Sequence, residues 1–133
     1  MEGAGVQVKL TNQEWKVYLD TRRKKDYQVV RAAWIGDYLD PSDFMEQYLS
    51  DAGESNFMGY ANKDYDDLLK QAANEIDPKK RMEEFQKAEA TFLHDEPIIP
   101  IYHYVNVHMI SKKVAGWHNN LLGYNLERYL SLN

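Results

Sequence analysis

Residues 31–41 combine the side-chain types that suit a positively charged amine. An apolar run ends at Trp34 and passes into a turn that contains Gly36 and Asp37. A carboxylate such as that of Asp37 accepts charge-assisted hydrogen bonds from an ammonium group, and the indole of Trp34 attracts the same cation through its quadrupole. The sequence therefore predicts an amine-binding site at this turn, with the guanidinium of Arg31 close by.

Residue spacings typical of enzymes, metal sites and phosphate sites are absent from the sequence. It has no G-x-S-x-G nucleophile motif, no H-E-x-x-H pair and no glycine cluster before a helix. We therefore expect no enzyme activity, no metal and no cofactor. One alternative stays open, which is a small hydrolase that uses Asp37 and Asp40 as paired carboxylates.

The composition limits the class of partner. The net charge of -5 argues against nucleic acid, because binding to phosphates requires a basic surface. The absence of cysteine excludes disulfides, and no apolar run is long enough to span a membrane. Ten tyrosines among 133 residues fit either a hydrophobic core whose edge contacts water or the wall of a ligand cleft.

The first part of the chain predicts a strand, a helix and a second strand. Val6, Val8 and Leu10 alternate with polar residues, and Thr11 with Glu14 forms a capping-box pattern that starts a helix ending near Lys25. Residues 27–34 form the next apolar run. Two strands joined by a helix predict a βαβ unit with parallel strands.

The middle of the chain predicts a short helix from Pro41 to Leu49 and then a helical hairpin. The hairpin helices begin at Asn62 and at Asp77-Pro78, and the second ends near His94. Their apolar spacing predicts a shared core of Tyr65, Leu68, Leu69, Ala72, Ile76, Met82, Phe85, Ala88, Phe92 and Leu93.

Residues 98–110 alternate between an apolar face and a polar, aromatic face, which predicts a strand whose second face lines a cleft. After Lys113 the sequence is irregular up to a short amphipathic tail at residues 126–132. One βαβ unit makes a thin sheet, so we expect this chain to be the end of a longer one.

Further motifs extend along most of the chain from Gly5. They are Asn12-Gln-Glu-Trp15-Lys, Asp20-Thr-Arg22, Arg31-Ala-Ala-Trp34-Ile-Gly-Asp37-Tyr38, Asp40-Pro41 with Phe44, Gln86-Lys-Ala-Glu, and Pro97-Ile-Ile-Pro100-Ile-Tyr-His-Tyr104-Val-Asn106. In this combination they resemble the C-terminal portion of oligopeptide-binding proteins of bacterial ABC importers, which are extracellular solute-binding proteins of family 5.

The resemblance implies an α/β fold that is a partial lobe of a type II periplasmic binding protein-like fold, with the βαβ unit and the helical hairpin. It implies that residues 1–104 form the C-terminal half of the peptide-binding lobe. Residues 105–133 would then be a crossing segment that returns to the other lobe.

The resemblance also implies how a peptide is held. Asp37 would bind the N-terminal ammonium, and Tyr104 would contact the peptide backbone. The other implied ligand-binding residues are Trp34 as a cleft wall, Ile35 and Gly36 through their backbone groups, and Arg22 and Arg31 near the peptide carboxylate. On this basis we expect Asp37→Ala to abolish peptide binding and Asp40→Ala to leave it intact.

The partners that the resemblance implies are an oligopeptide ligand and the permease subunits of an ABC transporter. A dipeptide, a murein peptide, a sugar oligomer or a nickel chelate are alternative ligands for the same scaffold. The implied location is the periplasm or a cell-surface lipoprotein. We expect the chain alone to fold but to hold an incomplete site, and its exposed strand edges could pair two copies into a homodimer.

Overall fold

The computed structural model describes residues 5, 7–120 and 123–133. These residues form four α-helices, which are α1 (Trp15–Lys24), α2 (Ser42–Met45), α3 (Lys63–Asn74) and α4 (Pro78–His94). Short 3-10 turns, η1 (Glu46–Tyr48), η2 (Gly53–Ser55) and η3 (Glu127–Tyr129), lie between the other elements. The strands β1 (Val114–Ala115) and β2 (Ser131–Leu132) pair antiparallel.

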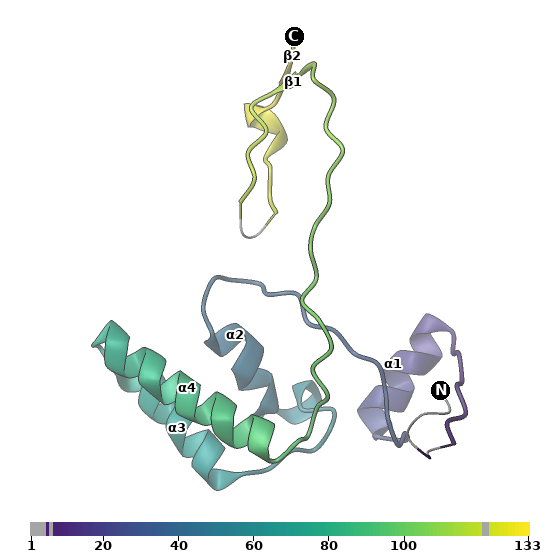
Figure 1. The fold of residues 1–133 in the computed structure, drawn as a ribbon, viewed down its shortest axis with the longest axis vertical. Helices are drawn as coiled ribbons and strands as arrows, with labels where there is room; N and C mark the ends of the chain where they lie inside the picture. The colour runs from purple at the N-terminus through teal and green to yellow at the C-terminus, as the bar shows by residue number, and fades with distance from the viewer. Residues whose placement is uncertain (1–4, 6, 121–122) are drawn as a thin grey trace.

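The chain has an open shape. Figure 1 shows α2, α3 and α4 gathered in one cluster, with α1 set to one side of it. A long extended segment runs from the end of α4 to the small β1–β2 pair at the opposite end of the molecule (Figure 1). Most of the residues that the sequence assigns to a binding site lie in the segments that connect these bodies, whereas Arg22 lies in α1.

The hydrophobic core lies between α3 and α4. Its buried members are Tyr65, Leu69, Ala72, Phe85, Ala88 and Phe92. Phe92 is the centre of an aromatic cluster, since its ring lies 4.5 Å from that of Tyr48, 5.0 Å from that of Tyr60 and 5.6 Å from that of Tyr65. The predicted helical hairpin is confirmed, and η1 packs against it through Tyr48.

Three residues predicted for this core are exposed instead. Ile76 is 93% exposed because α3 ends at Asn74, so the helical periodicity no longer applies to it. Met82 and Leu93 lie at the margin of the α4 face, where no described element covers them. The apolar stripe of α4 is therefore narrower than its sequence predicts.

Side-chain caps explain where the helices begin. Asn62 and Asp77 accept hydrogen bonds from the first free N–H groups of α3 and α4, and the sequence predicts this role for Asp77. The cap of α1 is Glu14, whose carboxylate accepts from Lys16 N at 2.8 Å. The prediction of Thr11 as the cap was wrong, because the Glu14 carboxylate itself reaches the first turn and complements the helix dipole.

The predicted βαβ unit is not formed by the described residues. Residues 7–10, 27–34 and 98–110 are extended or bent, but no adjacent backbone pairs with them. Val6, which was to begin the first strand, lies outside the described residues. Alternating side chains favour an extended backbone, whereas a strand also requires a neighbour for its N–H and C=O groups.

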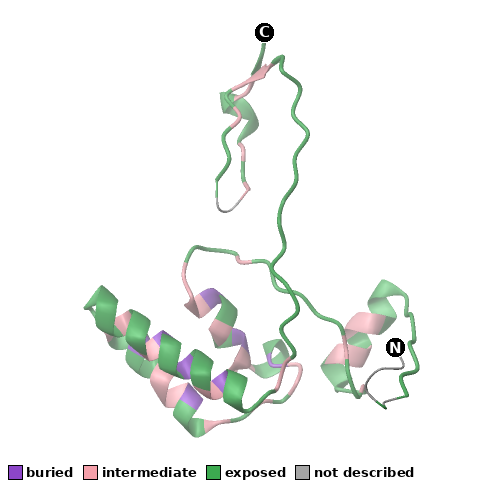
Figure 2. Cartoon of the chain, in the orientation of Figure 1, coloured by how far each residue is buried: buried purple, intermediate pink, exposed green. Residues whose placement is uncertain are grey.

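The extended segments leave their apolar side chains in solvent. Figure 2 shows the long connection after α4 almost entirely exposed, while the buried residues lie in and beside the helical cluster. On the predicted apolar face the exposed fractions run from 77% to 98% for Ile99, Ile101, Val105, Val107 and Met109. None of the described helices combines the length and apolarity that crossing a membrane requires.

Candidate functional site

The turn that carries Asp37 is built against the start of α2. Asp43 is buried in the first turn of this helix, and its Oδ2 accepts a 2.8 Å hydrogen bond from the Asp37 backbone N–H. A Cβ on Gly36 would lie 2.7 Å from the same oxygen and 3.0 Å from the Phe44 ring. Gly36 is therefore needed for the close approach between the turn and the helix.

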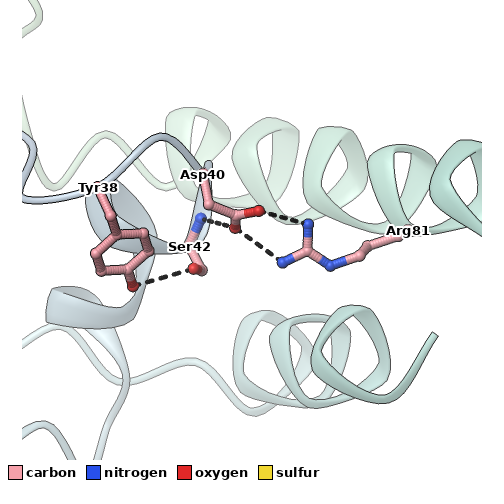
Figure 3. A network of polar contacts seen from close by, with 4 residues as sticks. All are labelled: Tyr38, Asp40, Ser42 and Arg81. Carbon is pink, nitrogen blue, oxygen red and sulfur yellow. Dashed lines mark hydrogen bonds and ion pairs between the residues drawn. The ribbon is translucent and has the colours of Figure 1, made fainter. Parts of the chain in front are cut away.

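A second carboxylate fastens this turn to α4. The guanidinium of Arg81 donates hydrogen bonds of 2.7 and 2.8 Å to the two oxygens of Asp40, as Figure 3 shows. Asp40 Oδ1 also accepts the backbone N–H of Ser42 at 3.0 Å. The Arg81 guanidinium holds the pKa of the Asp40 carboxyl well below its usual range.

The carboxylate of Asp37 is exposed and has no partner among the described polar contacts. Its backbone is fixed by Asp43, while its side chain is available to solvent. The neighbouring Ile35 is also largely exposed, and Gly36 is half-buried. The turn therefore presents one negative group on a fixed backbone.

Arg31 and Tyr104 are brought together across the two extended segments. Arg31 Nη2 donates to the Tyr104 hydroxyl at 2.7 Å and lies 3.3 Å from the Tyr102 hydroxyl. The backbone carbonyl of Arg31 accepts a 2.8 Å hydrogen bond from the hydroxyl of Tyr18 in α1. Arg31 is thus bound to tyrosines and not to Asp37.

The two tyrosines of this cluster affect each other. Their rings meet edge to face at 5.0 Å, so Tyr102 and Tyr104 share one side of the extended segment as predicted. The neighbouring Tyr104 hydroxyl and the Arg31 guanidinium lower the pKa of Tyr102. The cluster therefore combines a cation with two hydroxyls at an exposed surface.

Arg22 and Trp34 meet at a separate shallow cavity of about 190 Å³. The cavity is lined by Leu19, Arg22, Arg23, Trp34, Glu54, Ser55 and Phe57. The Arg22 guanidinium carbon lies 3.8 Å from the centre of the Phe57 ring and 5.4 Å from that of Tyr18. Its Nε is buried without a hydrogen-bond partner in the described structure.

The predicted site residues thus form two contacting groups and one separate turn. Arg31 lies with Tyr104, Arg22 lies with Trp34, and Tyr18 touches both groups. No described contact joins the Asp37 carboxylate to either group. Within the described ranges, no cluster of histidine, aspartate and glutamate is arranged to hold a metal ion.

Sequence reasoning gave no role to Tyr18, Asp43 and Arg81. Tyr18 lies in α1, and its hydroxyl reaches the backbone of Arg31, which is 13 residues later in the chain. Asp43 could have been noticed as an acidic residue in the first turn of a helix that directly follows the Asp37 turn. Arg81 carries no local signal, because its partner lies 41 residues earlier in the chain.

Comparison with known proteins identifies related sequences. Residues 1–56 match the model of the bacterial extracellular solute-binding proteins, family 5 middle region. The dipeptide-binding protein of Bacillus subtilis is 39% identical over 120 residues, which are 90% of this chain and 22% of that protein.

Solved structures show the same arrangement of the chain. The murein tripeptide-binding protein of Escherichia coli superposes with a TM-score of 0.82 at 34% identity, over 97% of this chain and 25% of its own. The oligopeptide-binding protein of Haemophilus influenzae, solved with the peptide RPPGFSPFR, gives 0.81 at 34% identity over 93% of this chain and 24% of its own. This chain therefore spans about a quarter of the length of these structures, and its open shape is the one the matched segment has within them.

Proposed function

Because this chain belongs to the bacterial extracellular solute-binding proteins of family 5, we propose that it supplies part of a peptide-binding site for uptake by an ABC transporter. The relatives it matches include proteins named for dipeptides, oligopeptides and a murein tripeptide. An oligopeptide is the ligand we propose, and a dipeptide, a murein peptide, a sugar oligomer or a nickel chelate on the same scaffold are the alternatives.

The observation that carries this proposal is the exposed Asp37 carboxylate on a fixed turn. All peptides with a free N-terminus carry an ammonium group, which a single carboxylate can hold by charge-assisted hydrogen bonds. Asp43 fixes the backbone of Asp37 through a hydrogen bond, so the Asp37 carboxylate needs little reorganisation when it binds the ammonium group. In this proposal Asp37 anchors the peptide N-terminus.

The extended segments contribute the peptide backbone contacts. Residues 27–35 and 98–110 carry N–H and C=O groups without strand partners in the described chain, so an extended peptide can add to them. Tyr104, held by Arg31, and the backbone of Ile35 and Gly36 would contact the peptide. Trp34 would form a wall, and the Arg22 guanidinium would help to balance the charge of the peptide carboxylate.

We assign residues 1–104 to the C-terminal half of the peptide-binding lobe and residues 105–133 to a crossing segment that returns to the other lobe. The partners in this proposal are an oligopeptide and the permease subunits of the transporter. The location is the periplasm, as in relatives that are named periplasmic, or a cell-surface lipoprotein. The unpaired segments also make a homodimer of the isolated chain a testable outcome.

A hydrolase based on Asp37 and Asp40 is disfavoured by the salt bridge of Asp40. A general acid needs a carboxyl group whose pKa is raised, so that it carries a proton near neutral pH. Arg81 has the opposite effect on Asp40, because it lowers the pKa of that carboxyl. We therefore propose a binding protein and not an enzyme.

The test replaces the matched segment of the Haemophilus influenzae oligopeptide-binding protein with this chain; we refer to this hybrid as the chimera. Isothermal titration with the nonapeptide RPPGFSPFR should give saturable binding, with the unchanged Haemophilus influenzae protein as the control. A folded chimera that binds neither this peptide nor shorter peptides would contradict the proposal. The 133-residue chain alone should show only weak shifts of its Trp34 indole signal in NMR titrations with the same peptide.

A further inference from the structure

We propose that Asp40 and Arg81 are positioning residues that hold the Asp37 turn at a fixed place relative to α4. This inference gives the proposed peptide site two residues that do not touch the ligand. It depends on the proposed function for its effect on binding, but the fastening of the turn can be measured without any ligand.

Asp40 and Arg81 form an ion pair with two parallel hydrogen bonds. Arg81 lies in the first turn of α4 and approaches Asp40 with both terminal nitrogens, at 2.7 and 2.8 Å. Their side chains are 29% and 28% exposed, so solvent screens this pair less than a fully exposed one. The paired geometry fixes orientation as well as distance, which a single lysine contact does not.

Hydrogen bonds at the start of α2 connect Asp40 to the backbone of Asp37. The Asp40 carboxylate accepts a hydrogen bond from the Ser42 N–H at 3.0 Å. The backbone carbonyl of Asp40 accepts one from the Asp43 N–H at 3.2 Å. The buried Asp43 carboxylate then accepts the Asp37 N–H at 2.8 Å. A continuous series of hydrogen bonds therefore runs from Arg81 through the start of α2 to Asp37.

Arg81 also contacts the hydrophobic core. Its guanidinium carbon lies 4.6 Å from the centre of the Phe85 ring, and Phe85 is a buried member of the α3–α4 core. The turn is thus attached to the best-packed part of the chain, although Asp37 itself is exposed. Loss of the ion pair should release the turn and leave the helical hairpin folded.

The ligand-free test uses the 133-residue chain and amide hydrogen exchange measured by NMR. Arg81→Lys and Asp40→Asn should each speed exchange of the Asp37 amide by about five-fold, the factor that corresponds to a weak ion pair. The core amides of α3 and α4 should speed by a smaller factor than the Asp37 amide, because they report the global stability of the chain. Lys87→Ala is the matched control, because it removes an exposed ion pair with Glu84 on the same helix.

Unchanged Asp37 exchange in both variants would overturn the inference. Equal acceleration throughout α3 and α4 would also overturn it, because the ion pair would then act on global stability alone. Arg81→Lys keeps the charge and the helix, so a loss of Asp37 protection in this variant points to the paired geometry.

The binding test uses the chimera with RPPGFSPFR and its N-acetylated form. Asp40→Asn should weaken binding of the free peptide by about five-fold and reduce the preference over the acetylated form. This replaces the expectation from sequence that a change at Asp40 leaves binding intact. A chimera without any preference for the free N-terminus would count against Asp37 as the anchor. The hydrogen-exchange test would still show whether Asp40 and Arg81 hold the Asp37 turn in place.

Discussion

The guanidinium of Arg31 donates a 2.7 Å hydrogen bond to the hydroxyl of Tyr104, which lies 73 residues later in the chain. The contact joins the segment before the Asp37 turn to the segment after α4. The carbonyl of Arg31 is also bound by Tyr18 of α1, so three parts of the chain meet at one residue. Arg31 therefore organises the surface that we assign to the peptide backbone.

Removing the charge of Arg31 should alter the titration of a nearby tyrosine. The Tyr104 hydroxyl and the Arg31 guanidinium lower the pKa of Tyr102, because they stabilise its phenolate form. In Arg31→Gln the pKa of Tyr102 should rise towards its ordinary value of about 10. NMR titration of labelled tyrosine rings measures this shift.

Arg23→Gln is the control for that titration, because Arg23 pairs with Glu54 away from the tyrosine cluster. It should leave the titration of Tyr102 unchanged. Equal Tyr102 titrations in the wild type and in Arg31→Gln would show that Arg31 does not act on this cluster in solution.

The contribution of Asp40 to stability should depend on pH. Its pKa in the folded chain lies below the ordinary value of about 4, so the unfolded chain binds this proton more readily. The contribution is therefore complete above pH of about 4 and is lost as the pH falls through the lower folded pKa.

Urea unfolding of the wild type and Asp40→Asn measures this dependence. At neutral pH the variant should be less stable by less than about 1 kcal/mol, because solvent screens the ion pair. The difference in the free energy of unfolding should shrink as the solution is acidified. A difference that is constant from neutral to strongly acidic pH would contradict the assignment.

Phe92 should be the residue of α4 on which the hairpin depends most. Phe92→Ala removes the centre of the cluster formed with Tyr48, Tyr60 and Tyr65, and such a change typically costs about 3–5 kcal/mol. Leu93→Ala, at the exposed neighbouring position, should cost less than about 1 kcal/mol. Urea unfolding followed by circular dichroism compares them, and equal losses would mean that the core is not where we place it.

Asn62 should do more than cap α3. Its amide also donates a 2.7 Å hydrogen bond to Asp95 at the end of α4, and this bond lowers the pKa of the Asp95 carboxyl. Asn62→Ala and Asp77→Ala should each cost about 1 kcal/mol as lost caps. The Asp95 pKa should rise in Asn62→Ala alone, which NMR titration of its carboxyl group measures. A rise in both variants, or in neither, would contradict this role of Asn62.

The helices could be predicted from sequence because their signals are local. The caps Asn62 and Asp77 and the end of α1 at Lys25 depend on residues within one turn. The periodic apolar residues of α3 and α4 then define a hairpin core. The α/β architecture itself came from the family resemblance, and the solved relatives agree with it.

The strands and the support of the turn could not be predicted in the same way. Residues 27–34 and 98–110 have strand-like alternation, but pairing depends on a neighbouring backbone that the described chain does not provide. The link between Asp40 and Arg81 depends on how the hairpin packs against α2. Neither the strand pairing nor the Asp40–Arg81 link can be recognised from residues that are close together in the sequence.

The affinity of the chimera for free and N-acetylated RPPGFSPFR shows whether the Asp37 carboxylate anchors a peptide N-terminus. We expect the free peptide to bind at least about 30-fold more tightly, as for a desolvated charge pair. Asp37→Asn should remove this preference. Equal affinity for the two peptides in the unchanged chimera, or a preference that survives Asp37→Asn, would contradict the role of Asp37 as the anchor.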